Sequence, residues 1–170
     1  VKLLLDEMAR LKMNLCHWQL GDDQGWRIEL KKYPWLTKVG SDRKSTQVGE
    51  KKWKSNKQSG QPHSGYYTQA QIKEIVNYAA QRHITIVPEI EMPGHSSAAV
   101  AAYPWLGTEN KQIEVPVKFG RFYDIYDVTN PRVTIFIEDV LQEVFSLFPS
   151  KVIHIGGDEV SYDAWTKSSK

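Results

Sequence analysis

Two adjacent carboxylates near the end of the chain, Asp158 and Glu159, are the residues best suited to acid–base chemistry. They follow the β-branched run 152–155, which predicts a buried strand, and two glycines, which allow a sharp turn or the close approach of a ligand. Neighbouring side chains leave an extended backbone in opposite directions, so we expect the two acids to have different roles. The structural alternative is that Asp158 caps a following helix and Glu159 lies in its first turn.

Two other predicted strands also end beside groups that can carry a proton. The strand-like run 13–20 stops just before Asp22, and the strand 84–87 leads into a proline-containing loop that ends at His95. Aspartate is common in turns and a single histidine is often structural, so each residue alone indicates little. On a parallel sheet, however, the carboxyl ends of the strands lie at one edge, where α/β proteins place their sites. We therefore expect Asp22, His95, Asp158 and Glu159 to converge.

Helices are predicted between these strands, because apolar residues recur there at a spacing of three or four. One covers residues 3–11, with Leu4, Met8 and Leu11 on its apolar face. The second starts at a capping box, Thr68 to Gln71, and a helical turn follows over residues 96–103. The last starts at Asn130-Pro131 and carries an apolar stripe as far as Phe148. This alternation predicts an α/β fold with parallel strands joined by right-handed crossovers.

Composition is that of one soluble-type domain, with 170 residues and 41% apolar residues. No run of about eighteen apolar residues occurs, which excludes a helical membrane span in the sequence. The lone cysteine, Cys16, cannot form an internal disulfide and is expected to be buried, and the compartment stays open. The chain begins at Val1 rather than Met, which fits a mature form or a piece of something longer.

Charge is concentrated in one segment, because residues 38–62 contain seven Lys or Arg against Asp42 and Glu50. With a net charge of +2 for the whole chain and +5 for this segment, the remainder carries 2 − 5 = −3. A basic patch that includes Trp53 is compatible with nucleic acid or an anionic glycan. The segment lacks periodicity and is rich in Ser, Gln and Gly, so we interpret it as a solvated loop and expect no nucleic-acid partner. The aromatic loop 105–127 either walls a pocket or covers the core.

Four blocks in order resemble the catalytic domain of the family-20 glycoside hydrolases, the β-N-acetylhexosaminidases: HWQLGDDQGWR at 17–27, YT at 67–68, VPEIEMPGH at 87–95 and HIGGDE at 154–159. The resemblance implies a partial (β/α)8 TIM barrel, roughly strands 2–4 with their helices. It implies that residues 1–170 are part of one catalytic domain, with a basic loop insertion at about 38–62. The family usually has histidine where Gln19 stands, and Thr or Val where Gly21 stands.

By this resemblance the chain acts in retaining hydrolysis of terminal N-acetylglucosamine or N-acetylgalactosamine, with the acetamido oxygen of the substrate as nucleophile. Glu159 is then the general acid and base, and Asp158 orients the acetamide. Asp22, His95 and His154 bind substrate or support the acid. Burial and the charge of Asp158 are expected to raise the pKa of Glu159. The resemblance implies glycan or chitooligosaccharide substrates, no cofactor and no metal, and it is compatible with a secreted, periplasmic or lysosomal location.

Two other hypotheses use the same residues differently. A metal-dependent hydrolase on the same fold would take Asp22, His95, His154 and Asp158 as ligands of a divalent ion, although no close metal-binding pair of histidines is apparent. Alternatively, the chain is an inactive fragment or a sugar-binding relic. In that case the unpaired edges of a partial sheet would favour self-association.

Overall fold

The computed structural model describes residues 1–49, 54–120, 122 and 124–166. It is an α/β protein whose central strands are parallel. Strand β1 (Leu15–Gln19) pairs with β4 (Thr85–Glu89), with Leu15 opposite Thr85 and Gln19 opposite Glu89. The predicted parallel arrangement of these two strands is therefore confirmed, and their carboxyl ends lie level with one another.

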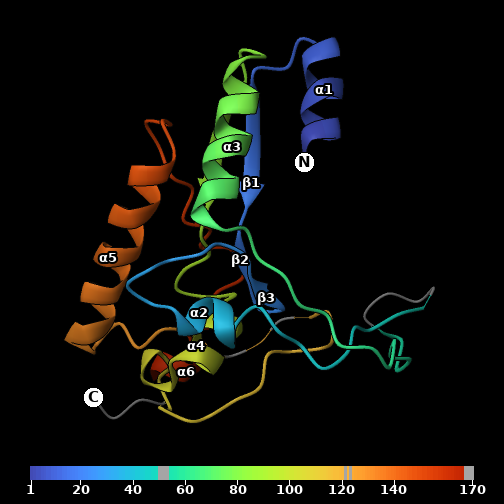
Figure 1. Cartoon of the computed structure of the whole chain (residues 1–170). Coiled ribbons are helices and arrows are strands. Elements are labelled where there is room, and N and C mark those ends of the chain that lie inside the picture. The colour runs from blue at the N-terminus through green and yellow to red at the C-terminus, as the bar shows by residue number, and fades with distance from the viewer. Residues whose placement is uncertain (50–53, 121, 123, 167–170) are drawn as a thin grey trace.

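Three helices pack in a row beside these strands: α1 (Lys2–Arg10), α3 (Gln69–Ala80) and α5 (Pro131–Leu147). Helix α3 is the middle one, and it contacts α1, α5 and β4 (Figure 1). The helices start where the sequence predicts. Thr68 and Gln71 form the capping box of α3, and the Asn130 side chain accepts a hydrogen bond from the N–H of Arg132 at the start of α5.

The predicted apolar face of the first helix is confirmed at Met8, which packs against the core, and is wrong at its other two positions. Leu5 is fully buried in α1, whereas Leu4 and Leu11, which we expected inside, are exposed. Spacing alone cannot separate these choices, because Leu3, Leu4 and Leu5 are consecutive and each starts a plausible stripe. The contact between α1 and α3 decides which of them is covered.

The predicted strand 152–155 is reduced to a single parallel bridge between His154 and Glu89. Its backbone still follows β4, since the His154 N–H donates to Pro88 O at 2.9 Å and the His154 carbonyl accepts from the Ile90 N–H at 3.0 Å. The prediction that this segment is buried is wrong at Val152 and Ile155, which are exposed, whereas Ile153 is partly buried and packs against the core. Among the described residues, β4 is the neighbour that pairs with it, so no second strand or covering layer completes its burial.

Short elements surround the carboxyl ends of the strands. The antiparallel pair β2 (Gly21–Asp22) and β3 (Gly25–Trp26) follows β1 directly. Further helices in the described part of the chain are α2 (Trp35–Lys38), α4 (Ser97–Ala102), the 3-10 helix η2 (Pro104–Leu106) and α6 (Asp163–Thr166). The predicted helical turn at 96–103 is thus present as α4. No helix in the described part of the chain is long and apolar enough to cross a membrane.

The described residues of the basic segment, 38–49 and 54–62, and the chain that follows them extend as an arm on one side of the molecule (Figure 1). Trp53 and the aromatic Tyr123 lie outside the described residues. Of the aromatic loop 105–127, Tyr126 is fully buried and Phe119 is exposed. The loop therefore both covers the core and supplies a surface side chain. Cys16 is buried, as expected.

Phe136 of α5 lies at the centre of an aromatic group within the core. Its side chain is 0% exposed, and its ring centroid is 4.7 Å from that of Tyr33, 5.9 Å from that of Tyr126 and 6.1 Å from that of Trp105. These contacts attach α5 to the loops that lead toward the carboxyl edge of the strands.

We predict that Phe136→Ala lowers the free energy of unfolding by about 3–5 kcal/mol, because it removes a fully buried ring and leaves a cavity. Phe145 of the same helix is 51% exposed and serves as the matched control. Phe145→Ala should change the free energy by about 0.5 kcal/mol or less. Urea unfolding of both variants measures the difference, and equal losses would contradict the packing described here.

Candidate active site

His95 lies at the centre of a group of acids at the carboxyl ends of the strands. Its Nδ1 atom is 3.4 Å from Asp22 Oδ1, and its Nε2 atom is 3.6 Å from Asp158 Oδ2 and 3.8 Å from Glu159 Oε2. Four residues that the sequence places on three separate segments therefore meet around one imidazole ring. His95 Nε2 is buried and has no hydrogen-bond partner among the described residues, since both carboxylates lie beyond 3.5 Å.

Asp158 and Glu159 point toward the same ring, which corrects the expectation that they leave the backbone in opposite directions. The backbone here is not extended, since Gly157 has φ 94° and Glu159 has φ 52°. The capping alternative is also wrong, because the next helix, α6, begins only at Asp163. The side chains are 64% and 54% exposed, so the burial that we expected around Glu159 is absent in this chain.

Asp23 is a site residue that the sequence did not single out. Its side chain is 1% exposed, and its Oδ2 atom lies 3.1 Å from His95 Nδ1. Its Oδ1 atom accepts hydrogen bonds from the backbone N–H of Ser97, at 3.0 Å, and from the Ser97 hydroxyl, at 2.7 Å. Asp23 thus fixes the His95 ring and joins it to the start of α4. Two adjacent aspartates in one turn gave no signal of which would point inward.

Asp22 is more open and lies between several polar groups. Its Oδ1 atom accepts the Asp23 N–H at 2.6 Å, and its Oδ2 atom accepts from Gln19 Nε2 at 3.4 Å. Partial burial raises the pKa of Asp22, and the hydrogen bond from the Asp23 N–H opposes that shift. Gln19, at the position where the resemblance leads us to expect histidine, therefore still donates to the site.

Glu91 is a second buried acid that the sequence analysis missed. Its side chain is 4% exposed and accepts a hydrogen bond from Gln19 Nε2 at 3.2 Å. It lies directly against the turn that carries the two carboxylates, since a Cβ atom added to Gly156 would be 1.8 Å from Glu91 Oε2. Gly156 also has φ 67°. Glycine is therefore required here both by the backbone and by the acid beneath it.

The charge state of Glu91 is set by its surroundings. Burial is the main cause that raises the pKa of Glu91 to about 9, and a hydrogen bond with Glu89 and the charges of Asp158 and Asp22 add to it. Glu91 is thus a neutral acid at pH 7. A neutral side chain here avoids placing another negative charge beneath Asp158.

His154 belongs to a separate group, which it forms with His17 and Glu89. His17 Nε2 forms an ion-pair contact with Glu89 Oε2, and His154 Nδ1 lies 3.4 Å from Glu89 Oε1. The two imidazole centroids are 4.7 Å apart. His154 Nδ1 also accepts the Gly156 N–H at 3.1 Å, so this residue supports the glycine turn.

The same groups bear on the metal hypothesis. Ligand atoms gather in three sets among the described residues: His17 with Glu89 and His154, Asp22 with Asp23 and His95, and Glu89 with Glu91 and Asp158. The proposed ligands Asp22, His95, His154 and Asp158 are divided among these sets. They do not form the single centre that the metal-dependent mechanism requires.

Two carboxylates face one histidine at the carboxyl ends of the parallel strands of an α/β protein, and further acids lie behind that histidine. Groups of this kind are suited to proton transfer. The comparison with known proteins then gives the family. The model of the glycosyl hydrolase family 20 catalytic domain matches residues 1–170, so this chain belongs to that family.

Relatives and solved structures agree with this assignment. The chain is 45% identical over 169 residues to a beta-hexosaminidase of Porphyromonas gingivalis, an alignment that covers 99% of this chain and 20% of the relative. It is 42% identical over 173 residues to a beta-hexosaminidase of Vibrio furnissii, covering 100% of this chain and 28% of the relative. A crystal structure of a beta-N-acetylhexosaminidase superposes with a TM-score of 0.90 at 37% identity, covering 99% of this chain and 34% of that one. The chain thus spans about a fifth to a third of these proteins.

We predict that Glu91 makes stability fall as pH rises. Its pKa is about 9 in the folded protein and near 4.5 when unfolded, so between these values the folded state binds more protons than the unfolded state. The free energy of unfolding therefore decreases with pH across that window. Glu91→Gln cannot ionise, so its free energy of unfolding should depend less on pH. Between pH 5 and pH 8 the variant should lose less stability than the wild type does.

Chemical denaturation at several pH values measures this slope. Glu138→Gln is the matched control, because Glu138 is exposed on α5 and its substitution should leave the slope unchanged. An unaltered slope in Glu91→Gln would show that Glu91 is ionised in the folded protein at neutral pH.

Proposed function

We propose that this chain is part of a β-N-acetylhexosaminidase, which removes terminal N-acetylglucosamine or N-acetylgalactosamine from glycans with retention of configuration. Family membership supports this function. The observation that carries it is the meeting of Asp158 and Glu159 within 4 Å of His95 Nε2, which places an acid pair beside a base at one edge of the sheet. Two relatives across nearly the whole chain are named beta-hexosaminidases.

Each acid has a separate task in this mechanism. Glu159 donates a proton to the glycosidic oxygen while the bond from that oxygen to the anomeric carbon breaks, and the acetamido oxygen of the substrate forms the new bond to that carbon. Asp158 orients the acetamide and stabilises the positive charge that develops on the cyclic intermediate. Glu159, now ionised, takes a proton from the water that opens the ring.

The remaining site residues support this pair. His95 lies between Asp23 and the two carboxylates, so its imidazole can hold a proton while Glu159 changes its protonation state. Asp22 supports His95 from the side of Nδ1. His154 holds the Gly156 N–H and thereby the turn that presents Asp158. We assign Asp22, His95 and His154 as supporting residues on these contacts.

For the architecture we propose that residues 1–170 are part of a (β/α)8 catalytic domain, containing roughly its strands 2–4, with a basic loop insertion at about 38–62. The parallel order β1, β4 and then the segment at His154 supports this arrangement. The exposed apolar residues Leu15, Val152 and Ile155 flank these strands. They would be covered by further strands of the barrel or, in this chain alone, by a second copy, which light scattering of the purified chain would detect.

We predict that Glu159→Gln in the whole enzyme lowers kcat for an aryl N-acetylglucosaminide by about 10² to 10⁴, because the amide cannot supply the proton. Glu109→Gln, a change of the same kind at an exposed position, is the control and should retain wild-type rates. Steady-state kinetics measures both. Undiminished hydrolysis by Glu159→Gln would remove Glu159 from its assigned role.

We predict that Asp158→Asn harms acetamido substrates selectively, because Asp158 acts on the acetamide. The measurement is the ratio of kcat/KM for an aryl N-acetylglucosaminide to that for the corresponding aryl glucoside, before and after the substitution. Asp163→Asn, five residues further on in α6, is the control. If wild-type enzyme cleaved the plain glucoside equally well, participation of the acetamide would be ruled out.

A further inference from the structure

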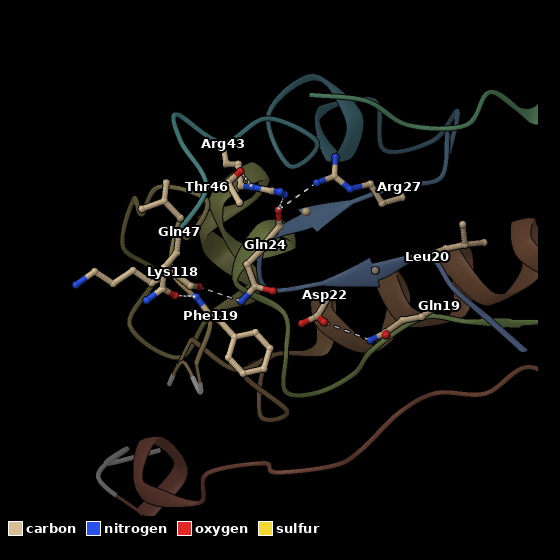
Figure 2. Close-up of a pocket in the computed structure, with 13 residues that line it drawn as sticks. Gln19, Leu20, Asp22, Gln24, Arg27, Arg43, Thr46, Gln47, Lys118 and Phe119 are labelled. Carbon is tan, nitrogen blue, oxygen red and sulfur yellow. Dashed lines mark hydrogen bonds between the residues drawn. The ribbon is translucent and has the colours of Figure 1, made fainter. Parts of the chain in front are cut away.

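A pocket of about 400 Å³ lies beside the acid group, between β2–β3 and two loops. Figure 2 shows its side chains, which come from the strand ends, from residues 43–47 of the basic segment and from residues 117–119 of the aromatic loop. The roles proposed above use Gln19 and Asp22 but leave the rest of this pocket without a function.

The pocket is continuous with the reaction site through Asp22. Asp22 lines the pocket, and the same carboxylate lies 3.4 Å from His95 Nδ1. Phe119, which is exposed, presents its ring on the same side of the pocket as Asp22 (Figure 2). An aromatic ring beside a polar group is a surface suited to the apolar face of a sugar. A ligand in this pocket would therefore be adjacent to a sugar held at Asp158 and Glu159.

The other end of the pocket carries two arginines that hold loop backbone. Arg27 donates to Ser41 O and Gly65 O, each at 2.7 Å, and both Arg27 and Arg43 donate to Gln24 O, at 3.2 Å and 2.9 Å (Figure 2). Arg43 Nε also donates to Thr46 Oγ1 at 3.0 Å. Because a guanidinium has five N–H donors, these bonds leave both side chains with capacity for another acceptor.

In the described part of the chain no carboxylate is in direct contact with these two positive charges, although Asp42 lies near enough to interact with Arg27. Neither Arg27 nor Arg43 forms an ion pair within 4.0 Å in the described part of the chain, whereas Arg10 pairs with Glu7 and Arg82 pairs with Asp6. Burial lowers the pKa of Arg27 and the charge of Arg43 lowers it further, while the charge of Asp42 opposes both effects. Two half-buried like charges that line one hollow favour binding of an anion, which would relieve both effects.

We propose that this pocket binds the sugar on the leaving-group side of the scissile bond, and that Arg27 and Arg43 select a sugar that carries a carboxylate or a sulfate ester. The inference rests on the proposed hexosaminidase function and narrows its substrates to acidic glycans. Guanidinium groups bind both anions through paired hydrogen bonds, so the shared chemistry is an oxyanion on the penultimate sugar.

The test compares three disaccharides in the whole enzyme. Each has N-acetylglucosamine in β-linkage, and the second sugar is glucuronic acid, galactose 6-sulfate or galactose. We expect kcat/KM for at least one acidic substrate to exceed that for the neutral one by about tenfold, the gain from one charge-assisted hydrogen bond. The carboxylate and sulfate arms identify which anion is preferred. Equal values for all three would overturn the proposal.

Variants then locate the preference. Arg43→Gln should reduce the ratio of acidic to neutral kcat/KM by about tenfold, while Lys57→Gln, the same loss of charge at an exposed position of the same segment, should keep the ratio. Arg43→Lys retains the charge and lacks the paired donors, so it should lie between them. A ratio unchanged in all three variants would assign the preference to another part of the enzyme and refute this pocket.

A binding measurement separates this inference from the proposed function. Ligand-observed NMR on the wild-type chain compares methyl β-D-glucuronide with methyl β-D-glucoside, and it needs neither hydrolysis nor a folded variant. Stronger binding of the glucuronide supports the proposed acidic pocket, whether or not an aryl N-acetylglucosaminide is cleaved. Failure to cleave that substrate would reject only the hexosaminidase function. Equal binding of the two sugars rejects the acidic pocket and leaves the hydrolase function standing.

Discussion

The parallel register of the strands is the constraint on which the site depends. Gln19 lies opposite Glu89, and Glu89 bridges to His154, so three segments far apart in the sequence finish at the same level. The Met92 N–H donates to the carbonyl of Ile155 at 3.0 Å and continues this alignment beyond the last paired residue. A shift of either neighbour by one residue would turn its side chains to the other face and separate the acids from His95.

Register also explains why the acids are crowded. Glu89 and Glu91 are two residues apart in β4 and its extension, so their side chains lie on the same face. His17 and Gln19 of β1 also lie on that face. The chain reduces the repulsion in two ways. Glu89 pairs with His17, and Glu91 keeps its proton and accepts from the neutral amide of Gln19. Asp158 and Glu159 lie at the exposed end of this group of acids, where the proposed reaction uses them.

Two positive charges, those of Arg27 and Arg43, lie in the pocket on the side of Asp22 that faces away from His95. Arg27 and Arg43 hold the loops by donating to backbone carbonyls, which fixes the guanidinium groups without using a carboxylate. The basic segment was interpreted from its composition as a solvated loop. Much of it is exposed, but Arg43 is half-buried and structural, because it donates to Gln24 O in the turn between β2 and β3 as well as to Thr46 of its own segment.

The sequence by itself determined the order of helices α1, α3, α4 and α5 with strands β1 and β4, the capping box at Thr68 and the helix start at Asn130. It also determined the meeting of Asp22, His95, Asp158 and Glu159, because these features follow from local periodicity and from one rule of parallel sheets. Only the tertiary structure decided that Leu5 is buried instead of Leu4, that Asp23 holds His95, that Glu91 lies beneath Gly156 and that the segment at 152–155 is an exposed single bridge. Each of these depends on which surface packs against a given residue. That information resides in contacts between segments distant in the chain, which residue type and spacing do not encode.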